Sequence, residues 1–220
     1  MRRLLVGLGV LAILLVGADR GAKYVVEGRL ADHIESKESV SGVDVSIAGF
    51  PFLTQVVGNH FDQVDVTLPE FDARNSAALI DVQDVHVSFR DVATSNRYTR
   101  ATAASATGAG LVPYSEFDQF APVKVTYGGT SSSGDAYLSV SAPSLGPGAI
   151  RVVPSAADNL GLKLDSLSVV SAVLPRSLRT FVSASHDFGG LPSGISVKRL
   201  EATPDGLKVT LVGRHVTVAK

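Results

Sequence analysis

Histidine and carboxylate side chains are the groups in this chain that could perform acid–base chemistry or bind a metal. The histidines are scattered, and none forms an H-x-x-x-H or H-E-x-x-H pair with ligand spacing. They are His33, His60, His86, His186 and His215. The chain has no cysteine, which excludes thiolate ligands, Cys nucleophiles, disulfides and acyl-cysteine anchors. We therefore predict no metal site and no cofactor.

One local cluster of such groups lies in the sequence HFDQVD, residues 60–65. In an extended strand His60 and Asp62 share one face, whereas Asp65 lies on the other. Polar residues in this pattern usually form the solvated face of a strand. The chain contains no G-x-S-x-G sequence, phosphate-binding loop or dinucleotide fingerprint. We therefore predict that it is not an enzyme and has no catalytic residues.

The composition is that of a folded protein with one or two domains. Of its 220 residues, 45% are apolar and 19% charged, which is too apolar for a disordered chain. Its 20 Lys and Arg and 21 Asp and Glu give a net charge of −1. Because no basic field is present to hold a phosphate backbone, nucleic acid is excluded as a partner.

The N-terminus has the pattern of an export signal. Arg2 and Arg3 precede an uncharged stretch from Leu4 to Ala18. As a helix this stretch covers roughly 22 Å, against a hydrocarbon core of about 30 Å, so a permanent span is marginal. Small residues favour cleavage between Ala18 and Asp19, with a retained membrane anchor as the alternative and a buried core helix as a third. The chain is thus divided into residues 1–18 and a single domain of residues 19–220.

The residues that follow show a helical stripe and then strand alternation. From Asp19, which can cap a helix, to Ser39, apolar positions recur at helical spacing. We expect Val26, Leu30 and Ile34 to face the sheet and Glu27 to lie on the solvated side. A Leu30→Asp change should therefore destabilise the protein far more than Glu27→Gln. Lys23, Arg29, Glu35 and Lys37 complete the predicted solvated face.

Most of the remaining chain alternates with period two, which indicates antiparallel strands. The alternation slips at Gln83 and Asp84. Residues 99–110, almost all small, are either a linker or, as we prefer, a strand approached closely by a helix or ligand. Helices are predicted at Tyr114–Phe120 and from Pro175 to Ser185, with Leu178, Phe181 and Val182 along one stripe. The predicted strands cover residues 43–47, 64–68, 80–89, 123–127, 162–164, 167–169, 195–197 and 207–211.

The segment GFPFL, residues 49–53, is the most informative local sequence. Two phenylalanines flank a proline that fixes its own backbone, and Thr54 can cap a short turn through Gly58. Phe50 and Phe52 are either core residues or ligand contacts. Burial alone would stabilise each by roughly 1.5–3 kcal/mol, so taken by itself the segment favours the core interpretation.

The same segment resembles the LmeA-type phospholipid-binding proteins, a bacterial cell-envelope family. The similarity covers AGFPFLTQVVGNHFDQVDVTLPEF at 48–71 and continues in three further segments along the chain. These are LVPYSEF at 111–117, LPRSLRTFV at 174–182 and LPSGISVKRLEATPDGLKVTLVGRHVTV at 191–218.

This resemblance implies an α+β fold of the tubular lipid-binding (TULIP, BPI-like) kind. A long N-terminal helix and a second helix would pack on a strongly curved, mainly antiparallel sheet around an apolar groove. It also implies a non-enzymatic protein that binds anionic, phosphatidylinositol-type phospholipid at a membrane surface and supports lipoglycan and mannan biosynthesis. Envelope glycosyltransferases are possible partners. The alternatives are an envelope enzyme acting on lipid-linked sugar and a ligand-free scaffold. Groove candidates are Phe50, Pro51, Phe52, Leu53, Phe117, Leu178, Phe181 and Val182, and we expect Phe52 to contact lipid.

Export is the first testable prediction. N-terminal sequencing of the protein from its native envelope should show a mature chain that begins near Asp19, because the basic start, apolar stretch and small residues coincide. A membrane-bound chain that still begins at Met1 would identify a signal anchor. A soluble cytoplasmic pool with an intact Met1 would contradict export altogether.

Overall fold

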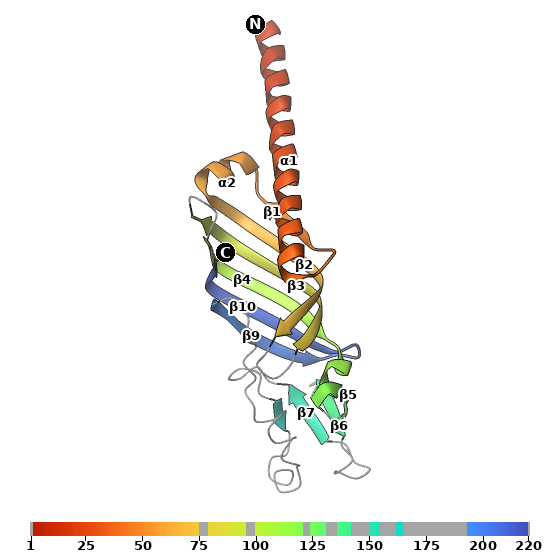
Figure 1. The fold of residues 1–220 in the computed structure, drawn as a ribbon. Coiled ribbons are helices and arrows are strands. Elements are labelled where there is room, and N and C mark those ends of the chain that lie inside the picture. The colour runs from red at the N-terminus through yellow and green to blue at the C-terminus, as the bar shows by residue number, and fades with distance from the viewer. Residues whose placement is uncertain are drawn as a thin grey trace. The chain divides into compact units, whose positions relative to one another are not determined.

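A computed structural model describes residues 2–74, 79–95, 100–120, 124–130, 136–141, 150–154, 162–164 and 193–219. Helices are few and strands dominate (Figure 1). The helical elements are α1 (Arg2–Glu38), α2 (Phe52–Gly58) and the 3-10 helix η1 (Tyr114–Phe120). The strands are β1 (Asp44–Ala48), β2 (His60–Arg74), β3 (Leu79–Thr94), β4 (Arg100–Val112), β5 (Lys124–Thr130), β6 (Ala136–Ser141), β7 (Ile150–Pro154), β8 (Leu162–Leu164), β9 (Ser193–Ala202) and β10 (Leu207–Ala219).

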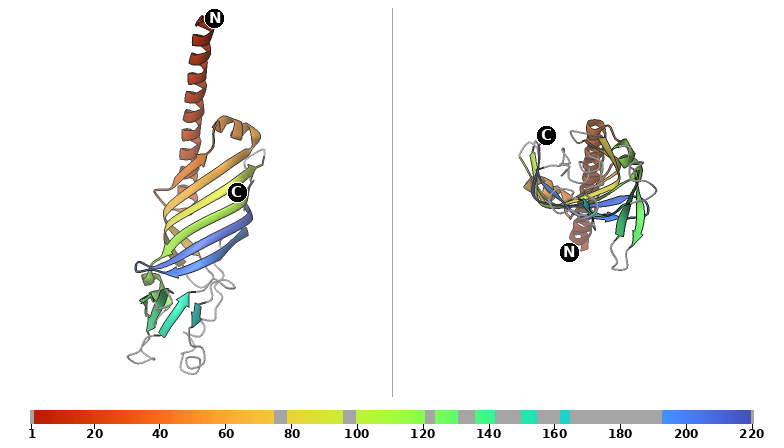
Figure 2. Two further views of the ribbon diagram at one scale, coloured as in Figure 1. Left: turned by 180° about the vertical axis from the view of Figure 1, so that it is seen from behind. Right: turned by 90° about the horizontal axis from the view of Figure 1, so that it is seen from below.

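The strands form two sheets. The larger has six strands in the order β1-β2-β3-β4-β10-β9, and the smaller has four in the order β5-β6-β7-β8. The larger sheet is curved but not closed, so β1 and β9 are its edges (Figure 2). The predicted α+β class, with a long N-terminal helix and a second helix on a curved antiparallel sheet, is confirmed. The observed second helix is α2, whereas the helix predicted from Pro175 lies outside the described residues.

Period-two alternation predicted β1, β2, β3, β5, β8, β9 and β10 but not β6 or β7, and the strand predicted at residues 167–169 lies outside the described residues. Residues 99–110 belong mostly to β4, which confirms the preferred strand over the linker. The predicted slip is also present, because Asp84 in β3 has a φ of 50°, a left-handed conformation that Asp tolerates better than most residues. A Cβ at Gly110 of β4 would collide with the Val82 side chain. The close approach that the small residues permit there comes from a neighbouring strand.

The chain forms two compact units. Unit 1 comprises Met1–Pro69, His86–Ala106 and Arg214–Lys220, and unit 2 comprises Glu70–Val85 and Thr107–Gly213. In unit 1 the buried apolar residues include Val45 and Ile47 of β1 and Phe52 of α2. In unit 2 a core cluster gathers around Leu138, Val140 and Leu207.

Tyr114 of η1 shows how tightly unit 2 is packed. Its ring lies against the core cluster, and its hydroxyl donates a 2.7 Å hydrogen bond to the Thr203 carbonyl. Burial raises the pKa of Tyr114 to about 12. The predicted helical turn at this place is confirmed as a 3-10 helix.

Three carboxylates attach α1 to the segment from Gly42 to Leu53. Glu35 Oε1 accepts hydrogen bonds from the backbone N–H of Gly42 (2.7 Å) and Val43 (3.0 Å). Glu27 Oε1 accepts one from Ile47 (2.6 Å) in β1, and Asp19 Oδ1 accepts one from Leu53 (2.8 Å) at the start of α2. Since β1 is an edge strand, its outward N–H groups need such partners.

This attachment corrects two expectations about α1. Glu27 and Glu35, placed by sequence on the solvated face, are half-buried and bind backbone N–H groups, and Lys23 from the same predicted face is half-buried beside Glu27. Leu30, placed on the buried face, is 39% exposed. Asp19 does not begin α1, because the helix runs without a break from Arg2. It lies buried inside α1 and caps α2 instead. The apolar stripe misled because carboxylates of α1 form hydrogen bonds with the segment from Gly42 to Leu53, so the side of the helix that faces this segment is not purely apolar.

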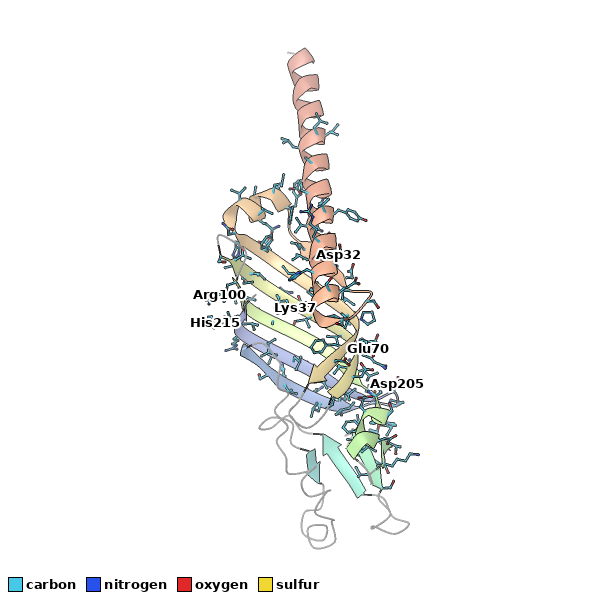
Figure 3. All side chains as sticks on the ribbon, viewed as in Figure 1. Asp32, Lys37, Glu70, Arg100, Asp205 and His215 are labelled. Atoms are coloured by element: carbon cyan, nitrogen blue, oxygen red, sulfur yellow. The ribbon has the colours of Figure 1, made fainter. Side chains whose placement is uncertain are left out.

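The exposed polar side chains of α1 include Asp32 and Lys37 in the last two turns (Figure 3). The helix ends at Glu38, one residue before the predicted end at Ser39, which has a φ of 57°. Among the described residues, no helix is both long enough and apolar enough to cross a membrane.

The hydrogen bond between Glu27 and Ile47 yields the second prediction. Glu27→Ala should lower the free energy of unfolding by about 1.5–3 kcal/mol, because it leaves an edge N–H without its charged acceptor. Urea denaturation of the two chains measures the difference. Glu27→Gln keeps an acceptor oxygen and should lose less, and Leu30→Asp should cost less than Glu27→Ala. A larger loss of unfolding free energy for Leu30→Asp than for Glu27→Ala would support the original prediction that Leu30 faces the sheet.

Candidate lipid-binding surface

The GFPFL segment turns the chain from β1 into α2. Gly49 has a φ of 100°, and a Cβ there would collide with the Gln55 amide and the Asp62 carboxylate, so glycine is required. The Phe50–Pro51 peptide bond is cis, and Pro51 is the N-cap residue of α2. The predicted cap by Thr54 is therefore wrong. Thr54 lies inside α2, and its hydroxyl donates a 2.7 Å hydrogen bond to the Pro51 carbonyl.

Gln55 holds α2 against the two strands that flank it. Its side chain is buried, and its Nε2 donates to the Ala48 carbonyl at the end of β1 (3.1 Å). Its Oε1 accepts from the backbone N–H of Asp62 in β2 (2.9 Å). Both ends of a buried amide are thus satisfied, as a polar group in a core requires. The position of α2 is therefore set by side-chain hydrogen bonds from Asp19 and Gln55.

The segment divides its two phenylalanines between core and surface. Phe52 is 1% exposed and packs on Phe61 of β2, with ring centroids 6.3 Å apart, as the core interpretation predicts. Phe50 is 57% exposed, and the Arg20 guanidinium lies 5.2 Å from its ring centroid. Pro51 and Leu53 are also exposed. Contact of lipid with any of the four residues stays a prediction.

The remaining groove candidates lie in unit 2 or outside the described residues. Phe117 packs against the core cluster of unit 2, whereas the GFPFL residues belong to unit 1. Leu178, Phe181 and Val182 lie outside the described residues. Among the described candidates, Phe50, Pro51, Phe52 and Leu53 lie together in unit 1.

The sheet of unit 1 has one apolar and one polar face. In the β1/β2 register Val45 lies opposite Val66 and Ile47 opposite Val64, whereas Ser46 lies opposite Asp65 on the other face. Thr67 Oγ1 is 3.0 Å from His86 Nδ1, which places His86 of β3 on the polar face. Alternation then puts Val87 and Phe89 on the apolar face. We call Val45, Ile47, Val64, Val66, Leu68, Val87 and Phe89 the apolar face.

Burial is uneven across this apolar face. Val45 and Ile47 are buried on β1, the strand that α1 contacts. Val64, Val66, Val87 and Phe89 are only half-buried. Four adjacent apolar side chains thus keep part of their surface uncovered on the same face, which is the property an acyl chain could exploit. Sequence reasoning recognised these residues as half-buried strand positions but did not propose them as ligand contacts.

The polar side chains of the HFDQVD segment were assigned to solvent in the sequence, and His60 and Asp62 alternate with Asp65 rather than sharing its face. His60 and Asp62 are exposed, and His60 Nε2 lies 3.9 Å from Asp91 Oδ1. Asp65, on the polar face, accepts hydrogen bonds from Gln63 Nε2 to both carboxylate oxygens (2.9 Å each). Arg100 at the start of β4 and His215 near the end of β10 lie on neighbouring strands and are exposed (Figure 3). Within the described part of the chain, no three His, Asp or Glu side chains gather as a metal-binding set.

Comparison with known families places the chain in a phospholipid-binding family. Residues 17–212 match the model of the LmeA-like phospholipid-binding family. Because the match covers most of the chain, the protein belongs to this family, and the resemblance noted at residues 48–71 is confirmed. Neither a curated protein nor a solved structure matches the chain.

The placement of Phe52 generates the third prediction. Phe52→Leu should lower the free energy of unfolding by roughly 1–3 kcal/mol, with or without lipid, because it leaves space beside Phe61 in a closed core. Thermal and urea unfolding of delipidated protein measure the loss. Phe50→Leu, at the neighbouring exposed position, is the matched control and should change stability by at most about 0.5 kcal/mol. A small loss for Phe52→Leu that coincides with weaker stabilisation by lipid would instead make Phe52 a ligand contact.

Proposed function

We propose that this member of the LmeA-like phospholipid-binding family is a non-enzymatic carrier or sensor of anionic, phosphatidylinositol-type phospholipid in the cell envelope. The half-buried part of the apolar face, Val64, Val66, Val87 and Phe89, is the observation that supports it. An acyl chain laid on this surface gains roughly 0.8 kcal/mol for each CH₂ group removed from water. The head group would remain near solvent.

The N-terminal residues support an envelope location for this function. Arg2, Arg3 and the apolar stretch to Ala18 support export, with the domain working in the periplasm or envelope space and in contact with a membrane surface. A soluble lipid carrier in this space would support lipoglycan and mannan biosynthesis by supplying or sensing the lipid on which these polymers are built. Envelope glycosyltransferases are the partners that we propose for this role.

Lipid occupancy is the fourth prediction. Protein purified without added lipid, extracted into organic solvent and analysed by mass spectrometry, should release phospholipid. Delipidated protein should melt at a higher temperature when anionic phospholipid is added, because a ligand that binds only the folded state stabilises it by RT ln(1 + [L]/Kd). At a free ligand concentration of one hundred times Kd this amounts to about 2.7 kcal/mol.

A matched pair of variants ties the lipid effect to the apolar face. Val87→Thr keeps the shape of the side chain but adds a hydroxyl on that face, so it should reduce the melting shift produced by lipid. Ser88→Ala, the neighbouring residue on the polar face, should leave the shift unchanged. If no lipid co-purifies and no anionic phospholipid shifts the melting temperature, the alternative of a ligand-free scaffold for membrane glycosyltransferases is favoured. Turnover of a lipid-linked sugar would favour the envelope enzyme.

A further inference from the structure

Helix α2 presents apolar residues to solvent on the side that does not face the protein. Its inner side carries the buried Phe52 and Gln55, whereas Leu53 and Val57, one turn apart, are 40% and 82% exposed. Phe50, just before the helix, is exposed as well. We call Phe50, Leu53 and Val57 the α2 tip. Folding of the seven-residue helix does not by itself explain why two large apolar side chains in it and a third just before it are exposed.

The α2 tip is continuous with an apolar part of α1. The hydrogen bond from the Leu53 N–H to Asp19 joins α2 to α1 at this level. One turn further toward the N-terminus, Ile13, Leu14, Leu15 and Val16 are all exposed. Four consecutive helical residues, at 100° each, point to every side of the helix. The described protein therefore covers this part of α1 on no side.

A lipid bilayer is the occupant that fits both features. A second protein or a second copy of this chain would cover one side of α1, whereas apolar groups that point in every direction call for a surrounding apolar medium. Arg20 adds a charge suited to this setting, because its exposed guanidinium lies beside the Phe50 ring where apolar surface meets the polar boundary.

We propose that the α2 tip is a membrane-docking surface that inserts Phe50, Leu53 and Val57 into the interfacial region of an anionic lipid bilayer. Docking through the α2 tip would hold the protein at the membrane surface without a transmembrane helix. It does not depend on lipid bound to the apolar face. A chain processed after Ala18 would keep the α2 tip and Arg20.

The absence of cysteine makes a direct test possible. In the full chain, Val57→Cys is labelled with an environment-sensitive fluorophore and mixed with vesicles of equimolar phosphatidylcholine and phosphatidylglycerol. We expect a blue shift of the emission and quenching by doxyl-labelled lipid, with a smaller shift on vesicles of phosphatidylcholine alone. Arg90→Cys, labelled at an exposed position on the polar face of the same unit, is the control and should show neither change.

Flotation of the same samples separates docking from simple tethering. If the protein floats with the vesicles while the label at position 57 stays in water, the segment from Leu4 to Ala18 alone attaches it and the proposal is overturned. A label already shielded from water without vesicles would mean that protein covers the α2 tip, which also overturns it. Quenching of the label in a protein that shows no melting shift with phospholipid would retain docking and refute the proposed carrier function.

Discussion

The structure of unit 1 depends on satisfying backbone N–H groups along one stretch of chain, from Gly42 to Leu53. This stretch contains the edge strand β1 and the start of α2, both of which leave donors without partners in the sheet or the helix. Asp19, Glu27 and Glu35 of α1 supply the acceptors. Because Asp19 and Gln55 together fix α2, the same set of contacts decides that Phe52 is buried on Phe61 and that Phe50 and Leu53 face outward.

Much of the fold could be predicted because alternation reports directly which side of a strand is buried. The strands around Val43, Val64 and Ile80, and the slip at Asp84, follow from this pattern. The faces of α1 could not be predicted in the same way. A carboxylate that binds a backbone N–H looks, in sequence, like a carboxylate in solvent, and only the neighbouring strand reveals the difference between Glu27 and a surface residue.

The candidate site was predictable at the level of family and only partly at the level of residues. GFPFL was singled out in the sequence, but its spacing does not say which phenylalanine turns inward, since a tight turn at Gly49 and a cap from Asp19 decide this. Val87 and Phe89 were recognisable as strand residues. Their partial exposure depends on how far α1 reaches across the sheet, which is a property of tertiary packing that no local pattern contains.

The spacing of the three carboxylates has a geometric consequence. Asp19, Glu27 and Glu35 follow one another at intervals of eight residues, and eight residues of α-helix rise about 12 Å and rotate about 80° beyond two full turns. The line of attachment is therefore a spiral, and the stretch from Gly42 to Leu53 must wind partly around α1 to meet all three acceptors. The spacing of the three carboxylates along α1 therefore determines where this stretch can attach. A one-residue deletion between Glu27 and Glu35 would turn one attachment by about 100° relative to the other two, whereas the same deletion beyond Glu38 would leave their mutual spacing intact.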